Sequence, residues 1–228
     1  MSYLKAKNKF KWMDMQKEWL DEIKSKWRKL DIASYNLMDH DEWTVGDYEQ
    51  SPFCQLIWGE ILSRFLSKKY DQPYTYSINR NVLLVKSDGT CFRFLFDVMN
   101  NGKARYNRNK IEEDKNGCEF AYPFHYIGNF TPIPGMVKLP RSLQFIHKDF
   151  NEDWNQMLKY LQNHWKEFKM GDLSFDDYIE MTFQSAYFIE NQIKPIYSVE
   201  DIQNLIFKRG EKIERAFKEI LENKNKPF

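Results

Sequence analysis

Apolar side chains recur every three or four positions in five stretches of the chain, which is the spacing of one face of an α-helix. The most regular stretch begins at Phe150, reaches Phe168 and is followed by the helix-breaking Gly171. Two stretches begin with capping signals, Ser51-Pro52 and Ser174-Phe175-Asp176-Asp177. We therefore predict helices over residues 12–30, 51–69, 150–168, 174–194 and 198–223.

The stretch 12–30 carries three tryptophans on one helical stripe. Such a stripe docks on the remainder of the protein, or else it is an interaction surface, since tryptophan is enriched in binding hot spots. We place this N-terminal amphipathic helix, within residues 1–30, at the periphery of the fold.

Residues 73–98 change to the two-residue period of β-strands and are rich in aromatic and β-branched side chains. Asp88-Gly89 supplies a hairpin turn between two of the runs. A hairpin or three-stranded meander is predicted here, extended by residues 120–127. The prolines Pro132 and Pro134 are expected to end any strand and to begin an ordered loop. The fold class is α+β and mainly helical, with five or six helices packed around this small antiparallel sheet in a single domain, 1–228.

The composition indicates a folded protein with a substantial core rather than a disordered or disulfide-bonded one. Apolar residues make up 42% of the 228 positions, enough for a substantial core, and the net charge is only +1. Cys54, Cys91 and Cys118 are odd in number and widely spaced, which favours free thiols in a reducing compartment. No apolar run approaches the ~20 residues that span a bilayer. We expect a cytoplasmic protein without a membrane, metal or cofactor.

One segment has the chemistry of a nucleic-acid contact. Four cations alternate with a tyrosine that could stack on a base while the cations neutralise phosphates. A solvated loop is one alternative, because an acidic run follows at once, and another acidic partner is the second. The residues are Lys103, Arg105, Tyr106, Arg108 and Lys110.

A second segment could present polar groups to a ligand. Gly128 is expected to supply a backbone geometry that other residues avoid, and a rigid loop would then carry His125, Asn129 and the nearby Arg141. The alternative is a structural loop that satisfies its own backbone.

An enzyme would draw its acid–base groups from His125, His147 and Asp149, with Arg141 binding an anion. Asp149 also suits a helix cap. The nucleophile elbow, the P-loop, the dinucleotide fingerprint and the HExxH motif are all missing from the sequence.

The stretch from Tyr126 to Pro134, then Arg141, then a helix that opens with Asp153-Trp154, resembles an uncharacterised bacterial family classed as a domain of unknown function. The resemblance implies a bacterial or phage origin and transfers no activity. Our leading hypothesis is a non-catalytic binding protein for a protein or nucleic-acid partner, with phage–host conflict as its biological context. The alternative is an enzyme that acts on an anionic, phosphate-containing substrate near His125, Asn129 and Arg141.

Overall fold

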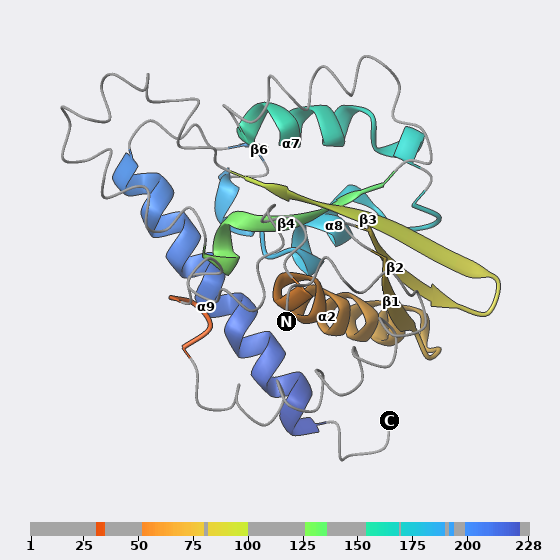
Figure 1. Cartoon of the computed structure of the whole chain (residues 1–228). Helices are drawn as coiled ribbons and strands as arrows, with labels where there is room; N and C mark the ends of the chain where they lie inside the picture. Colours follow the sequence, from red (N-terminus) through yellow and green to blue (C-terminus); the bar gives the residue numbers. More distant parts are fainter. Residues whose placement is uncertain are drawn as a thin grey trace, which may run out of the picture.

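The computed structural model describes residues 31–34, 52–79, 82–99, 126–135, 154–168, 170–189, 192–193 and 199–223. These residues form an α+β fold with four α-helices and a four-stranded antiparallel sheet of order β1-β2-β3-β4 (Figure 1). The helices are α2 (Pro52–Tyr70), α7 (Trp154–Asn163), α8 (Phe175–Met181) and α9 (Val199–Asn223). The strands are β1 (Thr75–Asn79), β2 (Val82–Ser87), β3 (Thr90–Val98) and β4 (Phe130–Pro134). Shorter pieces are the 3-10 turns η4 (Ile127–Asn129), η6 (Trp165–Phe168) and η7 (Ser185–Tyr187), and the hairpin β5 (Phe188–Ile189) and β6 (Gln192–Ile193).

The α+β class and the meander over residues 73–98 are confirmed, with Gly89 at φ 76° in the predicted turn between β2 and β3. The number of helices is not matched, because the described residues hold four α-helices rather than five or six. The predicted helix 174–194 is cut to the seven residues of α8, and η7 with the β5–β6 hairpin takes its place. The predicted helix 12–30 lies outside the described residues.

The expectation that the prolines end the strand is wrong, since β4 includes Pro132 and Pro134. The N–H of Gly135 donates to the carbonyl of Arg93, and that of Met99 donates to the carbonyl of Asn129. In an antiparallel ladder such bonded pairs alternate with unbonded ones. Both prolines therefore occupy unbonded positions, opposite Phe96 and Phe94, and their missing N–H groups face away from β3.

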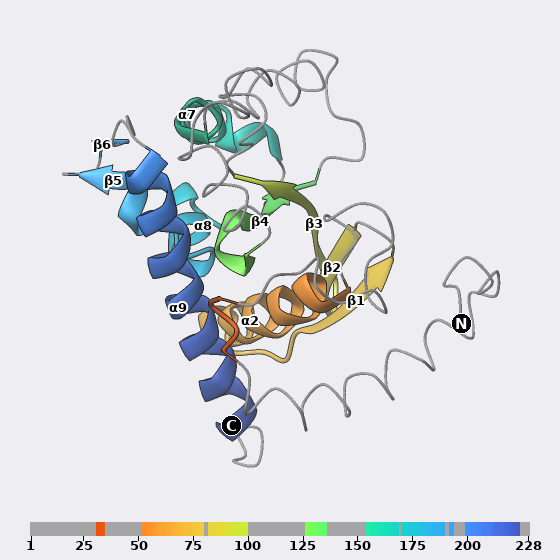
Figure 2. The same cartoon turned by 60° about the vertical axis from the view of Figure 1, so that its left-hand side comes forward.

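The strands β3 and β4 lie between α7 on one side and α2 on the other, as both views show (Figures 1 and 2). Alternate residues of β2 and β3 are buried and pair across the ladder, Leu83 with Phe94 and Val85 with Phe92. At β1, the ring of Tyr76 lies against α2 at Gly59, where an added Cβ would come within 2.4 Å of the ring. Packing of this meander on α2 therefore depends on a glycine.

Helix α9 runs past the end of the sheet (Figure 2). It contacts two segments that precede it in the sequence, one at Gly128 and one at Ala33. Gly128 touches its backbone, since a Cβ there would lie 1.9 Å from the carbonyl oxygen of Ile206. On another part of α9, Glu214 Oε2 accepts the N–H of Ala33 at 2.9 Å, and the neighbouring Ile32 is fully buried. Within the described ranges, none of the helices has the length and apolarity to cross a membrane.

Candidate functional site: a groove between α2 and α9

A network of buried polar side chains lies between β4 and the helices, with Gln184 at its centre. Gln184 Oε1 accepts the indole N–H of Trp154 at 2.8 Å. Its Nε2 lies 3.2, 3.3 and 2.8 Å from the hydroxyl oxygens of Thr131, Tyr178 and Thr182. All five side chains are at most 2% exposed, so each bond forms away from water. The network therefore fixes the turn after α8 relative to β4 and α7.

Arg209 of α9 extends this network to the outer edge of β4. Its Nη1 donates to the carbonyls of Gly128 and Phe130, each at 2.7 Å, and its Nε donates to the carbonyl of Thr182 at 2.9 Å. The Phe130 carbonyl belongs to the unbonded set of β4 and faces away from β3. The guanidinium thus satisfies acceptors that no strand among the described residues reaches.

The charge of Arg209 is held in an apolar setting. The side chain is 1% exposed, and its guanidinium carbon lies 5.1 Å from the ring centre of Trp58. Burial lowers the pKa of Arg209 to about 10, so the group remains protonated at neutral pH. No ion pair within the described ranges involves Arg209. Carbonyl dipoles and the indole ring are therefore its main stabilising contacts there.

The turn that Arg209 holds contains a strained residue, Phe183. The N–H of Gln184 donates to the carbonyl of Ile179, and the N–H of Phe183 donates to that of Glu180, which is the Schellman pattern that ends a helix. Its left-handed position normally takes glycine, yet Phe183 stands there at φ 55°. For a bulky side chain this conformation costs roughly 1–2 kcal/mol. Backbone strain of this kind clusters at functional sites.

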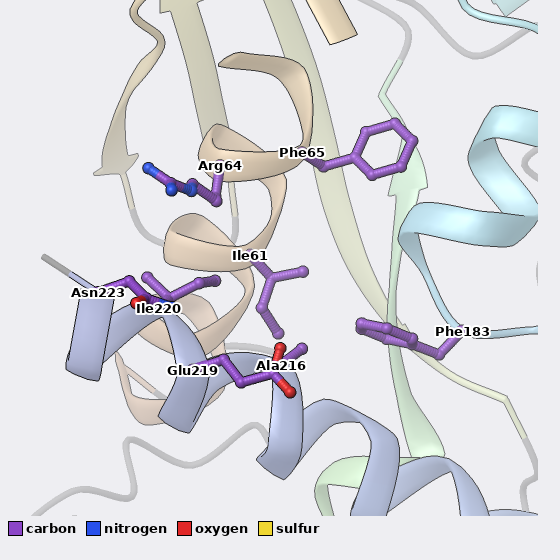
Figure 3. A pocket seen from close by; sticks show the side chains of 8 residues that line it. All are labelled: Ile61, Arg64, Phe65, Phe183, Ala216, Glu219, Ile220 and Asn223. Atoms are coloured by element: carbon purple, nitrogen blue, oxygen red, sulfur yellow. The ribbon is translucent and has the colours of Figure 1, made fainter. Parts of the chain in front are cut away.

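The side chain of Phe183 forms one wall of a groove between α2 and α9 (Figure 3). The groove encloses about 230 Å³, and Ile61 projects from α2 toward α9 within it. Its floor is apolar, while Arg64, Glu219 and Asn223 are exposed at its rim. The lining residues are Ile61, Arg64 and Phe65 of α2, Phe183, and Ala216, Glu219, Ile220 and Asn223 of α9.

This arrangement suits binding of an apolar side chain better than acid–base chemistry. The four groove residues Phe65, Phe183, Ala216 and Ile220 are half-buried and so remain open to a ligand. Among the described residues, no three His, Cys, Asp or Glu side chains gather where a metal ion could bind. Cys54 is fully buried, and burial raises the pKa of its thiol far above the usual range, which keeps it unreactive.

Only one of the site residues predicted from the sequence, Asn129, is among the residues that the structure describes. Asn129 lies in η4, and its side chain is fully buried. Its N–H donates to the carbonyl of Tyr126 and its own carbonyl accepts from Met99. The neighbouring Gly128 has no left-handed φ, so the predicted reason for that glycine is wrong; contact with α9 requires it. The remaining candidates lie outside the described residues: His125, Arg141, His147, Asp149, Lys103, Arg105, Tyr106, Arg108 and Lys110.

One sequence signal points to Arg209 as a special position. Position 209 falls three residues after Ile206 and four before Ile213, on the apolar stripe of α9. A cation on that stripe has to be buried or to interrupt the packing. No comparable local signal marks Phe183 or Gln184.

Comparisons with known proteins give no relative on which to base a function. No family model, no curated protein sequence and no solved structure matches this chain.

Proposed function

We propose that this chain is a non-catalytic binding protein that takes one large apolar side chain of a protein partner into the groove between α2 and α9. The proposal rests on the conformation and position of Phe183. A bulky residue occupies a position that favours glycine, and its ring forms the groove wall beside the buried Trp58, 6.2 Å between ring centres. The benefit of that ring in the groove offsets its backbone strain.

Size and charge favour a protein segment as the ligand. A volume of about 230 Å³ is below the roughly 300–1,000 Å³ of small-molecule sites, and it suits a single anchoring side chain. The rim carries both a cation, Arg64, and an anion, Glu219. A nucleic acid would bring phosphates close to Glu219, so its binding here is disfavoured.

A displayed library of random linear peptides tests the proposal, with two variants of adjacent residues. Ala216→Trp fills the groove, whereas Arg215→Trp adds the same ring to an exposed position outside it. Peptides selected on the wild type should carry an aromatic or large aliphatic anchor. They should bind Arg215→Trp equally well and Ala216→Trp at least about tenfold more weakly, which corresponds to about 1.4 kcal/mol.

Failure to enrich any peptide, or equal affinity for the two variants, would refute the proposal. Thermal unfolding monitors whether Ala216→Trp still folds. If it does not, Glu219→Arg replaces it, because that exposed side chain tolerates change. Reversal of the rim charge should then alter peptide affinity and its dependence on salt.

The other hypotheses remain predictions. Nucleic-acid contact through residues 103–110 is tested by gel-shift titration at about 50 mM salt with the double variant Arg105→Ala and Arg108→Ala. Loss of binding in that variant would support it. The enzyme near His125, Asn129 and Arg141 and the phage–host context rest on the sequence alone.

A further inference from the structure

The groove-lining residues follow the helical repeat on both walls. On α9 they are Ala216, Glu219, Ile220 and Asn223, at positions i, i+3, i+4 and i+7 of one stripe. The wall on α2 repeats the pattern over residues 61–65. Resting on the proposed function, we infer that the partner presents its anchor from an amphipathic α-helix that lies lengthwise between α2 and α9. Its acidic flank faces α2 and its basic flank faces α9.

The backbone of the groove walls offers no partner to an extended peptide. Residues 61–65 of α2 and 216–220 of α9 lie inside helices, so their N–H groups are bonded within those helices. The N–H of Phe183 is bonded as well, to the carbonyl of Glu180. An extended peptide is held by main-chain bonds to a sheet edge, which this groove lacks. A helix satisfies its own backbone and enters an apolar groove with its side chains alone.

The spacing of the walls also matches a helix better than a strand. One turn of a helix advances about 5.4 Å, so the side chains on one face of a partner helix meet ridges of the same spacing. Side chains on one face of a strand repeat at about 6.6 Å and would lose register. Ala216 and Asn223 are seven residues apart, about 10 Å along the axis. Two turns of a partner helix therefore cover the groove, with one large anchor beside Phe183.

The two walls carry opposite charges, which determine the flanks of the partner helix. Arg64 lies on the α2 wall and Glu219 on the α9 wall, and both are exposed (Figure 3). Lys68, one turn beyond Arg64, is exposed as well. A helix with acids on one flank and bases on the other meets an opposite charge on each wall, whereas a helix with a single sign of charge is repelled by one of them. Charge therefore selects the partner and its orientation.

Peptides enriched from the random library on the full chain test the helical form. Their apolar residues should recur at intervals of three or four, without internal proline. In one such peptide, a central residue that faces away from the anchor is changed to alanine, glycine or proline, which leaves the protein intact. Relative to alanine, glycine should weaken binding about three- to fivefold and proline at least about tenfold, in the order of helix propensity.

Other occupants of the groove give different results. Groove-binding peptides that are rich in proline, or whose affinity does not follow this order, would refute the helical partner and leave the proposed function in place, provided that they bind Arg215→Trp but not Ala216→Trp. If no peptide is enriched, both proposals fail. Dimers of the chain that Ala216→Trp abolishes and Arg215→Trp retains would assign the groove to a second copy, against the inference.

Charge reversal tests the two flanks. Arg64→Glu and Glu219→Arg should each weaken the selected peptide about two- to fivefold at low salt, the range of exposed charge pairs. Arg215→Glu, outside the groove, should leave its affinity unchanged. If Arg64→Glu does not fold, Lys68→Glu takes its place.

Rescue by the peptide assigns each flank to its wall. Reversal of the acidic residues of the peptide to lysine should restore binding to Arg64→Glu alone. Reversal of its basic residues to glutamate should restore binding to Glu219→Arg alone. Rescue of both variants by the same reversal, or of neither, would overturn the assignment.

Discussion

The Nε of Arg209 donates to the carbonyl of Thr182 at 2.9 Å, and this bond joins α9 to the turn that carries Phe183. The groove wall is therefore positioned by a buried cation that does not line the groove. Stability of the network and shape of the groove should change together when its bonds are removed.

Replacement of Arg209 tests the network directly. Arg209→Met leaves the carbonyls of Gly128, Phe130 and Thr182 without their donor, and each buried unsatisfied acceptor costs about 1–3 kcal/mol. Part of that cost is offset because the buried cation itself disappears. We expect a net loss of about 2–5 kcal/mol in urea unfolding, against less than about 0.5 kcal/mol for the exposed Arg215→Met. A loss below 1 kcal/mol in Arg209→Met would mean that charge burial cancels the bonds.

Trp154 and Trp165 both donate their indole N–H but differ in burial, so they provide a matched pair. Trp154 donates to buried Gln184, whereas Trp165 donates to the carbonyl of Leu173 from a half-buried position. Trp154→Phe should cost about 1–3 kcal/mol beyond the change in packing, because Gln184 Oε1 has no access to water. Trp165→Phe should cost clearly less in the same unfolding assay, and equal losses would contradict the described burial.

At position 183 the usual order of stability of alanine and glycine variants should be reversed. In most positions alanine is more stable than glycine, but at φ 55° glycine avoids the strain. Both substitutions remove the ring from Trp58 equally. Phe183→Gly should therefore be about 1 kcal/mol more stable than Phe183→Ala in chemical denaturation. The opposite order would show that this turn is not left-handed in solution.

Tyr76 should make stability depend on alkaline pH. Burial, followed by the nearby Glu60 carboxylate that accepts its O–H, raises the pKa of the phenol far above its ordinary value of about 10. A raised folded-state pKa contributes stability that is complete below pH 10 and is lost as pH rises further, since only the unfolded chain then releases its proton. The free energy of unfolding should fall more steeply between pH 9.5 and about 11 in the wild type than in Tyr76→Phe. Parallel curves would contradict the shift.

Local signals were sufficient for the sheet and for the helical stripes. The two-residue period and Asp88-Gly89 predict β2, β3 and their turn, because each depends on neighbours in sequence. The stripe of α9 likewise predicts its buried face, including Ile206 and Ile213.

The remaining features depend on contacts between distant segments. The apolar stripe of α9 marks Arg209 as an unusual position, but its carbonyl partners are identified only once the start of β4 lies against it, and Phe183 carries no sign of a left-handed turn. Pro132 resembles a strand breaker in the sequence, because only its register opposite Phe96 shows that its missing N–H faces away from β3. The groove itself exists only once α2 and α9 pack side by side.

The prolines of β4 have one more consequence, for the order of folding. Outer strands invite pairing with other molecules and so promote aggregation, and proline is one of the ways to prevent it. Arg209 covers the outer edge of β4 only after α9 has docked. Pro132 and Pro134 lack their N–H donors from the moment the chain is made. A nascent chain that has built its sheet but not yet α9 is therefore already protected against edge-to-edge assembly at β4.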